Sequence, residues 1–274
     1  MRRKCLAFLL LMVSLLCISG CRETEEPPAA VQAEILFINV GKADCALIYT
    51  AQNAFLIDTG TAESVPTVLS ALERAGIKKL TGIFLTHSHK DHIGGLAGIC
   101  QAYPVDMLYS SQISEEKISQ QAEDLSCPLT KLDVAEQVEA GTLFFEVLGP
   151  LEHNKKNEND NSLVLRLTVD EVVFLFTGDM QFAEERTLLS ANTVLSADVL
   201  KVGNHGNPDA TSYDFVQAVS PRYAVISTDT SVDEDSANFM VQARLGGAKI
   251  LLTQDRASGV RFLVREGGVL ELVS

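Results

Sequence analysis

The sequence predicts a mixed α/β fold in which two β-sheets pack together and helices cover their outer faces. Each half of the chain opens with strand-length apolar runs set close together and then alternates helical and strand patterns. The chain has 274 residues, 46% of them hydrophobic and 21% charged, which suits one large domain or two small ones. No internal repeat of the solenoid kind is visible.

The first half supplies the elements of one predicted sheet. A helix is expected over 64–77 because apolar residues recur at helical spacing and Gly76 provides a stop signal. Two more helical patterns follow, at 93–103 and 114–125. Strands are expected at 34–40, 45–50, 53–60, 80–86 and 105–110.

The second half repeats this style. Helices are expected at 181–190 and 212–220, and the polar run 152–161 reads as a surface loop. Strands are expected at 141–150, 162–169, 171–179, 197–206 and 222–227, with three more in the tail at 249–254, 259–266 and 268–274.

The N-terminus has the pattern of a bacterial lipoprotein signal, assigned to residues 1–20. A basic start precedes an apolar run that is too short for an ordinary membrane helix, and small residues then lead directly to Cys21. The pattern resembles a lipobox, which implies cleavage before Cys21 and lipid attachment to it. A plain secretory signal or an uncleaved anchor is the alternative. Residues 21–33 read as a flexible tether, and 34–274 as the folded domain.

Charge and cysteine content narrow the classes of partner. Without the leader, 19 basic residues face 36 acidic ones, a net charge of −17. Such a surface repels polyanions, so binding of nucleic acid is possible but disfavoured unless metals or a local basic groove compensate. Cys45, Cys100 and Cys127 remain, with no metal-binding or disulfide spacing, and Cys45 and Cys100 read as small core residues.

The segment "LTHSHKDHIGG" carries the strongest chemical signal. Three of the five histidines, together with Asp91, fall within the six positions 87–92, directly after an apolar run. A solvated polar loop would explain one histidine, but this density favours a metal site. In a loop after a buried strand, His87 and His89 could hold one ion while Asp91 and His92 hold a second.

This segment resembles the H-x-H-x-D-H motif of the metallo-β-lactamase superfamily. The runs "FINVGKADCALI", "FLIDTG", "DNSLVLRL", "FLFTGD" and "VLKVGNHG" follow the order expected of one branch, the hydrolase domain of ComEC-type DNA-uptake channels and its secreted relatives. Together they span roughly residues 34 to 228. The resemblance implies a four-layer αββα sandwich with two divalent metal ions, Zn²⁺ or Mn²⁺, at one edge.

The resemblance also implies which residues hold the two metals. His87 and His89 belong to the first metal, Asp91 and His92 to the second. Asp179 bridges both, although alone it could be a turn residue after a strand, and His205 is a further ligand of the second metal. Asp58 corresponds to an acid that orients the ligands.

Two departures from the family pattern concern the chemistry. Relatives usually carry a histidine where this chain has Asn204, and an amide can hold a substrate oxygen but cannot donate a proton as a histidinium can. The first metal often takes another histidine, and His153 in its polar loop reads as a surface residue instead. The "DNS" turn, Asp160 to Ser162, occupies the corresponding place, so the first metal site is expected to be the weaker.

The expected function is therefore a lipid-anchored, extracytoplasmic, metal-dependent hydrolase of a phosphodiester such as DNA, a nucleotide or a cell-surface phosphodiester. Metal-activated water would attack, Asp91 or Asp179 would orient it, and Asn204 would hold a substrate oxygen. The alternatives are a hydrolase of another ester or amide, and a cell-surface binding protein that keeps the fold with little chemistry. The natural substrate, the metal and the oligomeric state are left open.

Overall fold

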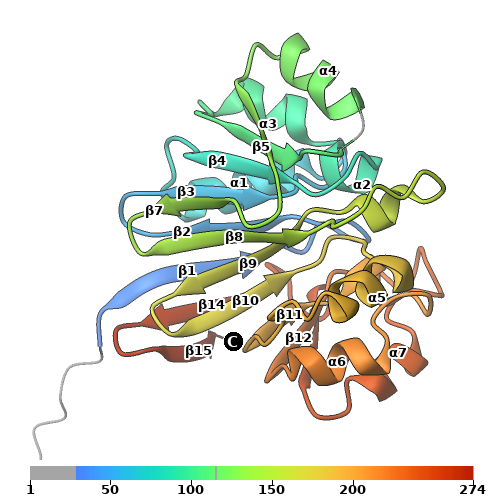
Figure 1. The fold of residues 1–274 in the computed structure, drawn as a ribbon. Coiled ribbons are helices and arrows are strands. Elements are labelled where there is room, and N and C mark those ends of the chain that lie inside the picture. Colours follow the sequence, from blue (N-terminus) through green and yellow to red (C-terminus); the bar gives the residue numbers. More distant parts are fainter. Residues whose placement is uncertain (1–28, 115, 274) are drawn as a thin grey trace, which may run out of the picture.

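The computed structural model describes residues 29–114 and 116–273, in which two β-sheets pack face to face (Figure 1). The predicted signal at 1–20 and the lipidation residue Cys21 lie outside the described residues. Strand β1 begins at Val31, inside the segment predicted as a tether. In residues 29–114 and 116–273, no helix is both long and apolar enough for a bilayer crossing.

The first sheet has eight strands, and it is antiparallel at one end and parallel at the other. The strands from β15 to β3 pair antiparallel, whereas those from β3 to β6 pair parallel. In spatial order they are β15 (Val269–Val273), β14 (Val260–Arg265), β1 (Val31–Phe37), β2 (Ala46–Tyr49), β3 (Ala54–Ile57), β4 (Gly82–Leu85), β5 (Leu108–Ser111) and β6 (Leu129–Leu132).

The second sheet has seven strands and the same mixed character. Strands β13 to β10 pair parallel and strands β10 to β7 pair antiparallel. In spatial order they are β13 (Lys249–Leu252), β12 (Tyr223–Ile226), β11 (Val199–Lys201), β10 (Val172–Phe176), β9 (Val164–Val169), β8 (Leu143–Gly149) and β7 (Gln137–Ala140).

Three apolar clusters define four layers. Between the sheets, aromatic rings interlock across the interface: the Phe145 ring lies 5.0 Å from that of Phe55 and 4.7 Å from that of Phe84, centroid to centroid. Separate clusters fill the space between each sheet and its outer helices. The helices are α1 (Val65–Arg74), α2 (Lys90–Ile93), α3 (Leu96–Ala102), α4 (Glu116–Asp124), α5 (Phe182–Ser190), α6 (Tyr213–Val219) and α7 (Phe239–Arg244), with 3₁₀ turns η1 (Glu158–Asn161), η2 (Gly203–Gly206) and η3 (Thr253–Asp255).

The predicted αββα sandwich is confirmed, and the differences are local. The helix expected at 93–103 begins at Leu96 as α3, and the short helix α2 ends before it at Ile93. The backbone packs closely at the two glycines between them, where a Cβ would stand 2.2 Å from a carbonyl oxygen at Gly94 and at Gly95. Strands β6 and β7 and helix α7 had no counterpart in the sequence prediction. Cys45 is buried, Cys100 packs against the outer cluster of the first sheet, and all three described thiols are free.

Candidate metal centre

The candidate site lies at one edge of the sandwich, where strands of both sheets end. Asp58 follows β3, the 87–92 turn follows β4, Asp179 follows β10 and His205 follows β11. Strands β3 and β4 are parallel, as are β10 and β11, so their carboxyl ends meet at a common edge. Four segments that are far apart in the sequence therefore converge.

One group of four side chains converges from both sheets. Ligand atoms of Asp91, His92, Asp179 and His205 lie within 4.8 Å of one another. The Asp179 Oδ2 atom is 3.2 Å from His92 Nε2 and 3.5 Å from His205 Nε2, and Asp91 Oδ2 is 3.4 Å from His205 Nε2. His92, Asp179 and His205 are buried, whereas the Asp91 side chain is a quarter exposed. Solvent therefore reaches this group of four side chains at Asp91.

A second group shares Asp179. His87 Nε2 and His89 Nδ1 are 3.0 Å apart, and Asp179 Oδ2 is 3.9 Å from His87 Nε2. His87 is fully buried, but His89 is exposed. The predicted pairing of the two histidines and the sharing of Asp179 both match this geometry.

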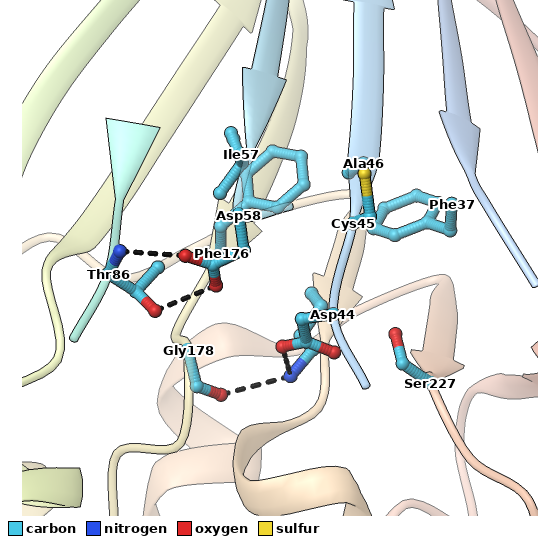
Figure 2. A pocket seen from close by; sticks show the side chains of 11 residues that line it. Phe37, Asp44, Cys45, Ala46, Ile57, Asp58, Thr86, Phe176, Gly178 and Ser227 are labelled. Atoms are coloured by element: carbon cyan, nitrogen blue, oxygen red, sulfur yellow. Dashed lines mark hydrogen bonds and ion pairs between the residues drawn. The ribbon is translucent and has the colours of Figure 1, made fainter. Parts of the chain in front are cut away.

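Hydrogen bonds fix the orientation of the buried imidazoles. His92 Nδ1 lies 2.7 Å from Asp58 Oδ2, and His205 Nδ1 lies 2.9 Å from the Ser227 carbonyl oxygen. Both acceptors require Nδ1 to carry the proton, so the Nε2 lone pair of each ring points into the group. Asp58 also accepts hydrogen bonds from the backbone N–H and hydroxyl of Thr86, as Figure 2 shows.

The buried charges shift several pKa values of the metal-free site. Burial lowers the pKa of His205, but the carboxylates, Asp179 foremost, outweigh it and raise that pKa to about 9. For Asp179 itself burial raises the pKa, and the facing His205 and His92 rings outweigh it and hold it well below its usual range. His87 differs, because burial and then the charge of His92 keep its pKa well below the usual value.

These groups fit a pair of divalent cations. Among the described residues, buried His92 Nε2, His205 Nε2 and Asp179 Oδ1 have no hydrogen-bond partner, although other carboxylate oxygens stand close by. Inward-facing imidazole lone pairs opposite carboxylates cost free energy unless a cation or proton joins them. Mixed imidazole and carboxylate donors suit zinc, manganese and similar ions.

Two buried charges at the site were not anticipated. Asp44, before β2, and Lys201, at the end of β11, form a buried ion pair, and the Lys201 ammonium also donates to the Gly178 carbonyl at 3.0 Å. They line a cavity of about 10 Å³, room for one water molecule, beside Thr86 and Asp58 (Figure 2). A lysine within the otherwise apolar run "VLKV", residues 199–202, was the available sequence signal.

The other residues singled out in the sequence, Asn204, His153 and the turn 160–162, lie outside the two groups of candidate metal ligands. Asn204 has the left-handed φ of 44° and donates its amide to Asp209 Oδ1 at 2.9 Å, so one of its two amide hydrogens is engaged. His153 is exposed and belongs to neither group. The surface-loop prediction was wrong for Asp160 and Asn161, which are buried. Ser162, predicted as the start of a strand, is also buried, and its Oγ accepts from the Asp179 backbone N–H at 3.0 Å.

An αββα sandwich with His and Asp groups at one edge defines the class of dinuclear metallo-hydrolase folds. Comparison with known proteins gives the same result: the description "Metallo-beta-lactamase superfamily" matches residues 38–230. The chain belongs to this superfamily, whose members are generally metallo-hydrolases with dinuclear metal sites.

The relatives narrow the branch. The chain is 27% identical over 224 residues to ComE operon protein 3 of Bacillus subtilis, covering 73% of this chain and 29% of that protein. It is 28% identical over 242 residues to competence protein ComA of Neisseria gonorrhoeae, covering 87% and 33%. The chain thus spans about a third of these curated relatives, and they support the predicted ComEC-like branch.

A solved structure supports the fold. The metallo-β-lactamase fold protein YhfI of Bacillus subtilis superposes with a TM-score of 0.59 at 13% identity, covering 85% of this chain and all of that one.

Proposed function

We propose that the chain is a metal-dependent hydrolase of phosphodiesters that acts outside the cytoplasm, anchored by lipid at Cys21. The observation that carries the proposal is the convergence of Asp91, His92, Asp179 and His205 with two buried imidazole nitrogens facing inward. Likeness to competence proteins favours a nucleic-acid or nucleotide phosphodiester. The acidic net charge, −17 once the predicted leader is removed, makes a small phosphodiester a better fit than long DNA.

Each residue of the site has a proposed role. His87, His89 and Asp179 would hold one cation, Zn²⁺ or Mn²⁺, and Asp179 would share the second with Asp91, His92 and His205. Such cations lower the pKa of water and neutralise charge that develops on phosphate oxygens.

The protein groups around this centre would bind and orient the substrate. Asp91 has the partly exposed carboxylate of the set and would accept a hydrogen bond from the attacking water. Asn204, with one amide hydrogen still available beside the site, would hold a substrate oxygen.

Hydrolysis of bis-p-nitrophenyl phosphate tests the activity. We expect protein beginning at residue 22 to bind two Mn²⁺ or Zn²⁺ ions and to turn over this substrate, and His92→Ala to lose both turnover and one ion. His153→Ala is the matched control, because it removes an exposed histidine outside both groups. Absence of turnover with either metal would contradict the proposal.

The alternative is a cell-surface binding protein that retains the fold. Asn204 in place of the usual histidine and the exposed His89 favour it. Its signature would be at most one ion per chain and no turnover, together with unchanged folding. The anchor is tested separately: Cys21→Ala should release the protein from the membrane fraction and abolish lipid labelling, and unchanged retention would exclude the lipid.

A further inference from the structure

Lys201 is a buried cation directly behind the candidate metal centre. Its residue is only 4% exposed, and among the described residues it is the only lysine or arginine that is buried. The ammonium pairs with Asp44 Oδ2, donates to the Gly178 carbonyl oxygen at 3.0 Å and lies 3.9 Å from Asp179 Oδ1. Burying a charged lysine costs free energy unless nearby negative groups compensate for the lost hydration.

The two carboxylate oxygens of Asp179 face different partners. Oδ2 faces the Nε2 atoms of His92 and His205, at 3.2 and 3.5 Å. Oδ1 faces Lys201 and has no hydrogen-bond partner among the described residues. The ammonium and the two imidazole nitrogens therefore approach different oxygens of this carboxylate.

Asp44 connects the same ammonium to the back of the histidines. Its Oδ2 atom is 3.8 Å from Nδ1 of His92, and its Oδ1 atom is 3.8 Å from Nδ1 of His205. Its backbone N–H donates to the carbonyl oxygen of Asp91 at 3.0 Å. The pair of Asp44 and Lys201 thus contacts the segments that carry the whole four-residue group.

The charges around the centre determine how Lys201 would affect cation binding. Asp44, Asp58, Asp91 and Asp179 bring four carboxylates together, and Lys201 stands among them as a counterion. A divalent cation held by Asp179 and the imidazoles would be repelled by the nearby ammonium through a poorly screened interior.

We propose that the charge of Lys201 tunes the metal centre: the ammonium balances the carboxylates of Asp44 and Asp179 before metal binds, and it weakens metal binding. The proposal rests on the metal binding assumed in the proposed function. It predicts a centre that releases its cations more readily than its ligands alone would dictate.

The proposal is tested by titrating Mn²⁺ into metal-free protein that begins at residue 22. The sign of the change in Kd in each variant decides the outcome. Lys201→Gln replaces the ammonium with a neutral amide that can still donate hydrogen bonds, so the Kd for Mn²⁺ should fall about tenfold. Asp44→Asn removes a negative charge from the same pair, so the Kd should rise about tenfold. The double variant restores the balance and should bind like the wild type.

The two single variants separate electrostatics from structural damage. Distortion of the site would weaken binding in both, and that result would overturn the proposal. If Lys201→Gln fails to fold, the comparison moves to the Asp44→Asn background, where adding Lys201→Gln must tighten binding about tenfold or the proposal is wrong. Wild-type protein that binds no Mn²⁺ would overturn the proposed function as well, which distinguishes the two failures.

Discussion

The two candidate metal positions differ in how the protein supports them. The group of Asp91, His92, Asp179 and His205 draws on the strand ends of both sheets, and its two imidazoles are fixed by bonds to Asp58 and to the Ser227 carbonyl. The group of His87 and His89 comes from one turn plus the shared Asp179, and His89 is exposed.

This contrast teaches that preorganisation, more than ligand count, separates the two positions. Ligands locked by buried hydrogen bonds lose little freedom when a cation binds, whereas an exposed side chain must be ordered at that moment. We therefore expect the four-residue position to load first and the His87–His89 position to load second, at higher metal concentration.

The largest effect should come from Asp179→Asn, which removes the carboxylate that both positions share. We expect neither ion to bind tightly and turnover of bis-p-nitrophenyl phosphate to fall by about a thousandfold. Metal content by mass spectrometry, with activity measured in parallel, checks this. Retention of one tightly bound ion would show that the two positions do not share Asp179.

The next effect is a pH dependence specific to the four-residue position. His205 has a pKa of about 9 in the folded metal-free protein, against about 6.5 when unfolded. Its stabilisation, of order 3 kcal/mol, is complete below about pH 6.5 and is lost as pH rises through 9, because only the folded state holds the proton in between.

Chemical denaturation of metal-free protein at pH 6 and pH 9.5 measures this loss. His205→Gln is the control, since it should remove the difference that His205 contributes. A stability difference that is equal in both proteins would contradict the assignment. With Mn²⁺ present the trend should reverse, because the cation requires the neutral ring.

A smaller and more selective effect is expected of His89→Gln. Because His89 is exposed and belongs only to the second-loading position, affinity there should fall by about tenfold to a hundredfold. The four-residue position should keep its affinity, and calorimetric titration can resolve the two events. Equal weakening of both would mean that the turn 87–92 behaves as one unit.

The smallest effect should follow Ser162→Ala. The Ser162 hydroxyl accepts the Asp179 backbone N–H at 3.0 Å and lies 3.4 Å from His87 Nδ1. Its loss should weaken the His87–His89 position by no more than about tenfold and leave the other nearly unchanged. A larger loss at the four-residue position would show that Ser162 acts mainly through Asp179.

Sequence reasoning identified the six converging ligand candidates because their motifs are short and sit directly after apolar strands. It missed Asp44 and Lys201 because their pairing depends on how β2 and β11, which belong to different sheets, come together, and residues so far apart in sequence share no local spacing pattern. Strands β6 and β7 were missed because each has only four residues, half of them polar, and only Leu132 among them is buried.

The polar run 152–161 shows a different limit. Its composition predicts a solvated loop, yet Asp160 Oδ1 accepts the backbone N–H groups of Gln181 and Glu184, which ties the run to the start of α5. Composition cannot reveal such side-chain to backbone bonds, because they depend on which segment lies opposite.

The direction of β1 determines at which rim of the sandwich the N-terminal segment joins the domain. This strand runs in the same direction as β3, since each is antiparallel to β2, so the chain enters the sandwich at the rim opposite the histidines. A tag or a surface coupled just before Val31 would therefore lie away from the candidate metal centre and leave its rim accessible to solutes.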